Sequence, residues 1–75
     1  MLSLLELEAG SEATLATLGG PRGFQRRLME MGLLPGTRVR MVRRNDLGGV
    51  VELEVRRCRM TLRQRDASEL RVVAN

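Results

Sequence analysis

Most of the chain alternates between apolar and polar residues, which is the pattern of β-strands with one buried face. Clusters of Gly, Pro, Asn and Asp separate the alternating runs and predict turns between them. The runs predict five short strands, over residues 12–18, 37–44, 50–56, 58–63 and 69–73. In the first and fourth of these strands, the positions expected to face the core are Ala13, Leu15, Leu18, Cys58, Met60 and Leu62.

The runs 37–44 and 50–56 flank a glycine-containing loop and predict a β-hairpin. A register that places Arg40 opposite Glu54 pairs opposite charges on the outer face. The same register pairs apolar residues on the inner face: Met41 with Leu53 and Val39 with Val55. Both faces are therefore consistent with one register.

Between residues 22 and 31 the apolar spacing becomes helical. Phe24, Leu28 and Met31 recur at i, i+4 and i+7, which predicts a helix with these three side chains toward the core. Gly32 follows where a left-handed residue commonly ends a helix, and Pro35-Gly36 fits the centre of a type II turn. A further single helical turn is expected over residues 65–68.

The chain is long enough for one small domain, residues 1–75, of 8.4 kDa. In so few residues, five strands close best as a barrel, which also removes exposed sheet edges. We therefore predict a mainly β fold, a small SH3-like barrel of about five strands with one short inserted α-helix.

The residues of common catalytic centres are scarce. The sequence contains no His, Trp or Tyr, and it has a single Phe and a single Cys. No His can act as a base, and no Ser lies in a nucleophile motif. Cys58 is expected to be buried, as a small hydrophobic side chain. We therefore expect a protein that is not an enzyme and has no bound cofactor.

A cytoplasmic location is expected from two features. A single Cys cannot form a disulfide within the chain. The N-terminal residues turn acidic at Glu6 and Glu8, before an apolar run long enough for a signal peptide accumulates. No run of apolar residues approaches the length of a membrane span, so no direct membrane insertion is expected.

Metal binding would have to use carboxylates, Cys58 and methionine thioethers, because His is absent. Glu6, Glu8 and Glu12 lie close together in the sequence and could suit a hard cation such as ferrous iron. A solvated acidic face is the simpler interpretation, and the five Met follow the positions of the core. We therefore assign no metal-binding residue.

All 13 basic residues are Arg, and the net charge is +4. Arginines at an edge of the barrel and around the helix make an Arg-mediated nucleic-acid interface an alternative: Arg22, Arg26, Arg27, Arg56, Arg57, Arg59, Arg63 and Arg65. Small barrels that bind single strands use aromatic platforms, and the one aromatic here, Phe24, is expected in the core. A solvated, partly ion-paired face is therefore favoured over a nucleic-acid groove.

Residues 26–37, Arg-Arg-Leu-Met-Glu-Met-Gly-Leu-Leu-Pro-Gly-Thr, resemble the signature of the FeoA family of small bacterial proteins of ferrous iron uptake. The similarity continues through residues 47–52, 60–63 and 66–72 and so covers nearly the whole chain. Where relatives tend to have Gly in the last hairpin turn, this chain has Arg56-Arg57, which raises the question of strain at positive φ.

The resemblance implies an SH3-like barrel with an inserted helix, related to the C-terminal domain of iron-dependent repressors. It implies a cytoplasmic accessory that docks on the cytosolic GTP-binding portion of the membrane iron transporter FeoB. The family is also labelled as binding transition metals, although this chain has no His to support that. Whether the protein activates, restrains or scaffolds its partner, and whether copies self-associate through a strand edge, stays open.

The partner-binding residues are expected beside the helix. Met29, Leu33 and Leu34 would form a small apolar patch with Arg26 and Arg27 at its rim, a composition typical of the centre of an interface. The alternative is that Leu33 and Leu34 close the mouth of the barrel.

Overall fold

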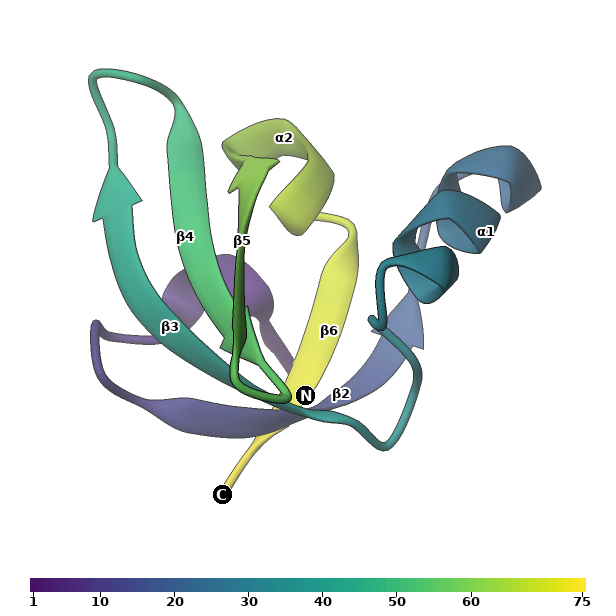
Figure 1. The fold of residues 1–75 in the computed structure, drawn as a ribbon, viewed down its shortest axis with the longest axis horizontal. Helices are drawn as coiled ribbons and strands as arrows, with labels where there is room; N and C mark the ends of the chain where they lie inside the picture. The colour runs from purple at the N-terminus through teal and green to yellow at the C-terminus, as the bar shows by residue number, and fades with distance from the viewer.

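The computed structural model describes all 75 residues as one six-stranded antiparallel sheet with two short helices (Figure 1). The strands are β1 (Leu2–Ser3), β2 (Glu12–Leu18), β3 (Arg38–Asn45), β4 (Val50–Val55), β5 (Cys58–Arg63) and β6 (Leu70–Ala74). A 3-10 turn, η1 (Leu4–Glu6), follows β1; α1 (Arg22–Glu30) lies between β2 and β3, and α2 (Gln64–Ala67) between β5 and β6. The predicted SH3-like barrel with one inserted helix is confirmed, and β1 is an additional short strand.

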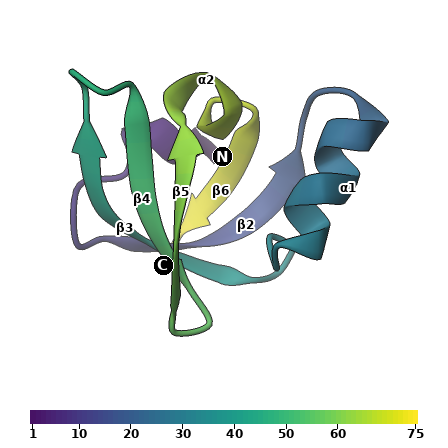
Figure 2. The same cartoon turned by 45° about the horizontal axis from the view of Figure 1, so that its top comes forward.

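The sheet curls into a barrel that does not close. Its strand order is β1-β6-β2-β3-β4-β5, so β1 and β5 each have one free edge. Our expectation that closure removes the sheet edges is therefore wrong. The two residues of β1 pair with β6 before the chain turns into η1, and no pairing joins β1 to β5. In Figure 2, β4 lies on one side of β5, and α1 lies on the opposite side, beyond β6 and β2.

The core is a single cluster of 15 buried apolar residues, supplied mainly by the inner faces of the strands. The register of β3 and β4 is the predicted one, with Arg40 opposite Glu54 and Met41 opposite Leu53. The register then shifts between Met41 and Arg43, so that Arg43 lies opposite Glu52. This bulge keeps an ion pair on the outer face, since it moves Arg43 into the position facing a carboxylate.

Helix α1 ends in a Schellman motif. Gly32 has a φ of +103°, the Leu33 N–H donates to the Leu28 carbonyl at 3.0 Å, and the Gly32 N–H donates to the Met29 carbonyl at 3.0 Å. The chain then reverses through the predicted type II turn. There the Thr37 N–H donates to the Leu34 carbonyl at 3.0 Å and Gly36 has a φ of +90°.

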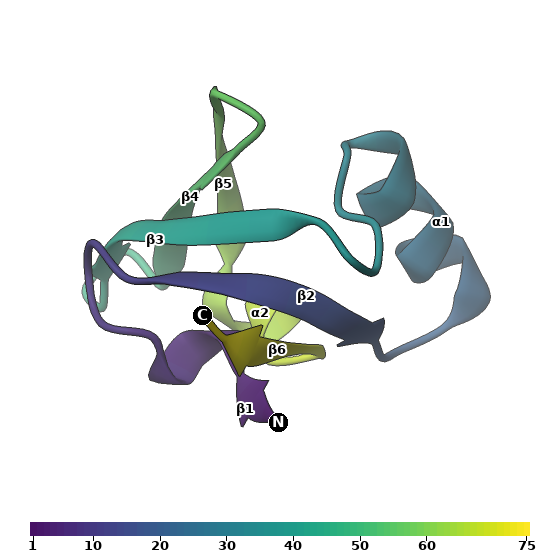
Figure 3. The ribbon, with the colours of Figure 1, turned by 90° about the horizontal axis from the view of Figure 1, so that it is seen from below.

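The apolar side of α1 is less buried than the periodicity predicts. Leu28 is buried, Phe24 is half-buried against the core, and Met31 is 46% exposed, so the expectation of three core positions is wrong for Met31. The reason is the position of the helix, which lies beyond the end of β2 with only part of its surface against the sheet (Figure 3).

The sequence pattern also predicts the wrong environment for Cys58. We expected it to be buried, but it is exposed. Cys58 is the first residue of β5 and pairs with Val55 beside the β4–β5 turn. Its side chain therefore lies at the very end of the sheet, where no other element covers it.

Candidate docking groove

A groove separates α1 from β5 and α2. Its volume is about 310 Å³. It is lined by Phe24, Arg27, Leu28, Met31, Thr61, Leu62, Arg63 and Asp66. We call this the α1–β5 groove. A second hollow of about 380 Å³ adjoins it at Phe24 and Asp66, and extends the concave surface past the start of α1.

The start of α1 is held by hydrogen bonds rather than by a capping side chain. Gln25 Nε2 donates to the carbonyl of Leu18 at 3.0 Å and to that of Gly20 at 2.9 Å. These two bonds tie the first turn of the helix to the end of β2. The other end is anchored by Leu33, which the Schellman motif folds back beside Leu28 in the core. Between these anchors, the wall that faces the groove carries Met31 and the ring of Phe24.

The predicted apolar patch is present only in part. Met29 and Leu34 are each 37% exposed, and Arg26 and Arg27 are exposed beside them. Leu33, however, is completely buried, so our placement of Leu33 on the surface is wrong. The alternative interpretation, that both leucines close the mouth of the barrel, is therefore correct for Leu33 and incorrect for Leu34. Met31 is a further exposed apolar side chain, on the side of α1 that lines the groove.

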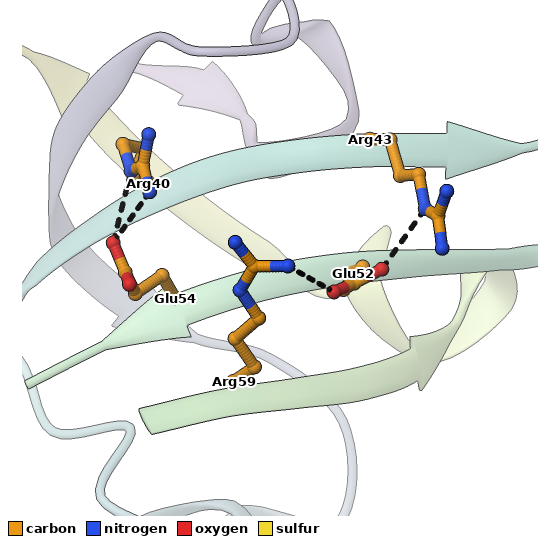
Figure 4. A network of polar contacts seen from close by, with 5 residues as sticks. All are labelled: Arg40, Arg43, Glu52, Glu54 and Arg59. Carbon is orange, nitrogen blue, oxygen red and sulfur yellow. Dashed lines mark hydrogen bonds and ion pairs between the residues drawn. The ribbon is translucent and has the colours of Figure 1, made fainter. Parts of the chain in front are cut away.

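On the outer face of the sheet, carboxylates of β4 neutralise part of the arginine charge (Figure 4). Glu52 lies between two arginines, at 2.9 Å from Arg43 and 3.2 Å from Arg59. Glu54 accepts from both Nε and Nη2 of Arg40, at 3.0 and 2.7 Å. This face is therefore partly ion-paired, but of the eight arginines considered for a nucleic-acid interface only Arg59 is in an ion pair.

The β4–β5 turn holds two arginines in left-handed conformations, with φ of +53° at Arg56 and +68° at Arg57. Two successive positive φ values make this a type I′ turn, which Asn and Gly adopt most readily. The backbone strain that the sequence suggests for this turn is therefore present. At positive φ both arginines have a steric clash at Cβ that glycine, which has no Cβ, avoids.

No three His, Cys, Asp or Glu side chains come close enough together to hold a metal ion. Glu6, Glu8 and Glu12 line a shallow hollow with Ser11 and other residues, and Glu6 already accepts from the Ser3 N–H at 2.8 Å. Cys58 is not among the residues that line this hollow. The ligand set considered for ferrous iron is therefore not assembled in one place.

Every buried side-chain nitrogen and oxygen has a hydrogen-bond partner, so none is left free in the interior to bind a ligand. The helices are too short to cross a bilayer, and none qualifies as a membrane span. Larger hollows lie elsewhere on the surface, but half of the residues lining the α1–β5 groove are apolar, against at most two in each of the others. The sequence indicated the helix side of this site but not Thr61 or Asp66, and it indicated Arg63 only as part of the nucleic-acid alternative. The only signal for these three residues is their place on β5 and in α2.

Comparison with known proteins gives a family and a fold. The family model described as FeoA domain matches residues 2–74. No curated protein sequence matches the chain significantly. The solution structure of the FeoA protein from Chlorobium tepidum is similar, with a TM-score of 0.89 and 29% identity over 97% of this chain and 70% of that one.

Two further structures extend the comparison. Iron(II) transport protein A from Clostridium thermocellum has a TM-score of 0.89 and 26% identity, over 97% of this chain and 45% of that one. A manganese-dependent transcriptional repressor in complex with manganese has a TM-score of 0.90 and 19% identity, over 97% of this chain and 36% of that one. At that identity the repressor shows the shared fold alone.

Proposed function

The chain belongs to the FeoA family, and from this premise we propose that it is a non-enzymatic cytoplasmic accessory of ferrous iron uptake. It acts by docking on the cytosolic portion of a FeoB-like membrane iron transporter and modulating it. The docking surface consists of the exposed side chains of Met29 in α1 and of Met31 and Leu34 just after it, with Arg26 and Arg27 at its rim.

The observation that carries this proposal is the exposure of three large apolar side chains on and just after one short helix. Exposing them to water is unfavourable by about 25 cal/mol for each Å² of apolar surface, and a partner that covers them recovers this free energy. Methionine and arginine are also enriched at the centres of protein interfaces. Similarity to a protein named iron(II) transport protein A supports the link to ferrous iron.

The proposal is tested with the double variant Met29→Glu/Leu34→Glu, which places two charges in the docking surface. In bacteria that lack their own copy of the protein, we expect this variant to lose most of the stimulation or restraint of ferrous iron uptake that the wild type confers. Radiolabelled iron uptake measures it, and direct binding of the purified chain to the cytosolic domain of the transporter measures docking. Circular dichroism verifies that the variant is folded.

The matched control is Leu47→Glu, because Leu47 is a fully exposed leucine at the tip of the β3–β4 hairpin, far from α1 (Figure 1). It should behave as wild type in both assays. Wild-type uptake and binding by a folded Met29→Glu/Leu34→Glu variant would reject this face as the docking site.

A second candidate function is Arg-mediated binding of nucleic acid by a regulatory module. It is favoured by one observation: of the 13 arginines, only Arg40, Arg43 and Arg59 are in ion pairs. It predicts binding that weakens by orders of magnitude between low and moderate salt. A titration of DNA and RNA oligomers at low salt that detects no binding eliminates it.

A further inference from the structure

We propose that the α1–β5 groove binds a segment of the partner protein as an additional β-strand on β5, and that this segment alternates apolar and acidic residues. The inference deepens the proposed function and rests on it for the existence of a protein partner. It names the mode of binding and the chemistry of the bound segment.

The free edge of β5 has unpaired backbone groups directed toward the groove. A two-residue turn, Arg56-Arg57, joins β4 to β5, so the flanking pair Val55 and Cys58 exchanges hydrogen bonds. Every second residue from Cys58 therefore bonds back to β4. The N–H groups of the intervening residues, Arg59, Thr61 and Arg63, point away from β4, and β5 has no second neighbouring strand.

The opposite wall of the groove fits the side chains of an added strand. Such a strand lies about 4.8 Å from β5, and its side chains alternate between the two faces of the sheet. Those on the inner face would contact Leu28, Met31 and Leu62, which line the groove. Met31 is the most exposed of these three and has the most surface to bury. Apolar residues at alternate positions of the segment therefore match this wall.

Side chains on the outer face of the added strand would lie beside Arg59, Thr61 and Arg63. Arg27 and Arg63 line the groove and have no ion-pair partner, whereas Asp66 is its one acidic residue. Opposite charges across neighbouring strands stabilise their pairing, so the other alternate positions of the segment should be Glu or Asp.

The same charges disfavour a second copy of this chain as the occupant. An antiparallel pair of β5 strands centred on Thr61 would place Arg59 of each copy opposite Arg63 of the other. Like charges directly opposite each other are destabilising. Strand addition beside a helix is, in contrast, a general way to bind an extended peptide, with backbone hydrogen bonds for affinity and alternate side chains for specificity.

The first test uses a blocked synthetic peptide of alternating Glu and Val, with a Lys and Val peptide as its control. We expect the acidic peptide to shift the amide resonances of Arg59, Thr61 and Arg63 together with those of α1, and to slow hydrogen exchange of the Thr61 N–H. The basic peptide should not bind. Shifts located elsewhere, or equal binding of both peptides, would overturn the proposal.

The second test uses Thr61→Pro, which removes an edge donor without removing a bond to β4, since proline is tolerated on edge strands. We expect it to weaken binding of the acidic peptide about tenfold or more. Arg63→Glu should weaken it similarly and leaves every backbone donor in place, so it tests the charge match if Thr61→Pro does not fold. Unchanged binding by both folded variants contradicts strand addition.

Binding to the transporter's cytosolic domain separates this inference from the proposed function. If Thr61→Pro and Arg63→Glu bind it like wild type while Met29→Glu/Leu34→Glu does not, docking stands and strand addition is wrong. If the wild type binds the acidic peptide at β5 but not the transporter, the groove is confirmed and the proposed partner is rejected. Loss of transporter binding in all three variants supports both the proposed docking on the transporter and strand addition at β5.

Discussion

Arg56 and Arg57 illustrate how one turn fixes the geometry of two strands. Both residues adopt positive φ values, and this type I′ geometry matches the right-handed twist of β4 and β5. The turn also decides which backbone groups of β5 face β4 and which face the groove. The cost is local, because each arginine side chain is placed in a conformation that is unfavourable by about 1 kcal/mol.

We therefore predict that Arg56→Asn/Arg57→Gly stabilises the protein. Asn-Gly is the preferred pair for this turn, so the free energy of unfolding should rise by about 1 kcal/mol. Urea denaturation followed by circular dichroism measures the change. Arg38→Gly, at an exposed position without positive φ, is the control and should lower stability by about 0.5–1 kcal/mol. A double variant no more stable than wild type would mean that the turn is not strained.

At the scale of elements, the end of α1 places two adjacent leucines in opposite environments. Gly32 reverses the chain, so Leu33 folds under the helix beside Leu28 and Leu34 stays at the surface. The hydrophobic contact between the residue after the glycine and the last helical turn is a regular part of the Schellman motif.

Alanine substitutions should separate these two leucines. Leu33→Ala removes a fully buried side chain and should lower the free energy of unfolding by about 2–5 kcal/mol. Leu34→Ala should change it by less than about 1 kcal/mol, because Leu34 is partly exposed. Thermal or urea unfolding measures both, and equal effects of the two substitutions would contradict the placement of Leu33 in the core.

The sequence was sufficient to predict five of the six strands, because alternation, turn chemistry and charge pairing are local properties; the two-residue strand β1 is too short to show alternation. The register of Arg40 with Glu54, the end of α1 just before Gly32 and the turn at Pro35-Gly36 follow from them. The burial of Met31 and Cys58 was predicted wrongly, because it depends on which element lies opposite. Periodicity finds the apolar side of a helix but not how far that side lies from the barrel.

The candidate site was predictable only in part for the same reason. Met29 and Leu34 lie on the exposed face that the sequence indicates, whereas Leu33 required knowledge of the chain reversal at Gly32. Nothing in the run 58–63 indicates that it forms an edge strand. That property follows from the strand order, in which β1 and β5 lie at the two ends of the sheet and do not pair, and the strand order is a feature of the whole chain.

At the scale of the molecule, the structure consists of a well-packed sheet and a helix attached at its margin. The strands supply most of the core, whereas α1 contributes Leu28 and a half-buried Phe24. Regions with few buried apolar contacts open locally at lower free energy than the central strands.

Native-state hydrogen exchange should therefore resolve two levels of stability. The amides of α1 should exchange through local opening, at a free energy below that of the strands β2, β3, β4 and β6. The difference shows when exchange is followed residue by residue at increasing denaturant. Equal free energies for α1 and these strands would mean that the helix unfolds only together with the barrel.

Exposure of Cys58 has a practical consequence. It is the only thiol in the sequence, and it lies at the first residue of β5, on the strand that borders the groove. A maleimide fluorophore or spin label can therefore be attached to the wild-type chain without any engineered cysteine. Its signal would report on ligands that arrive at this strand, in a protein whose interior the label leaves untouched.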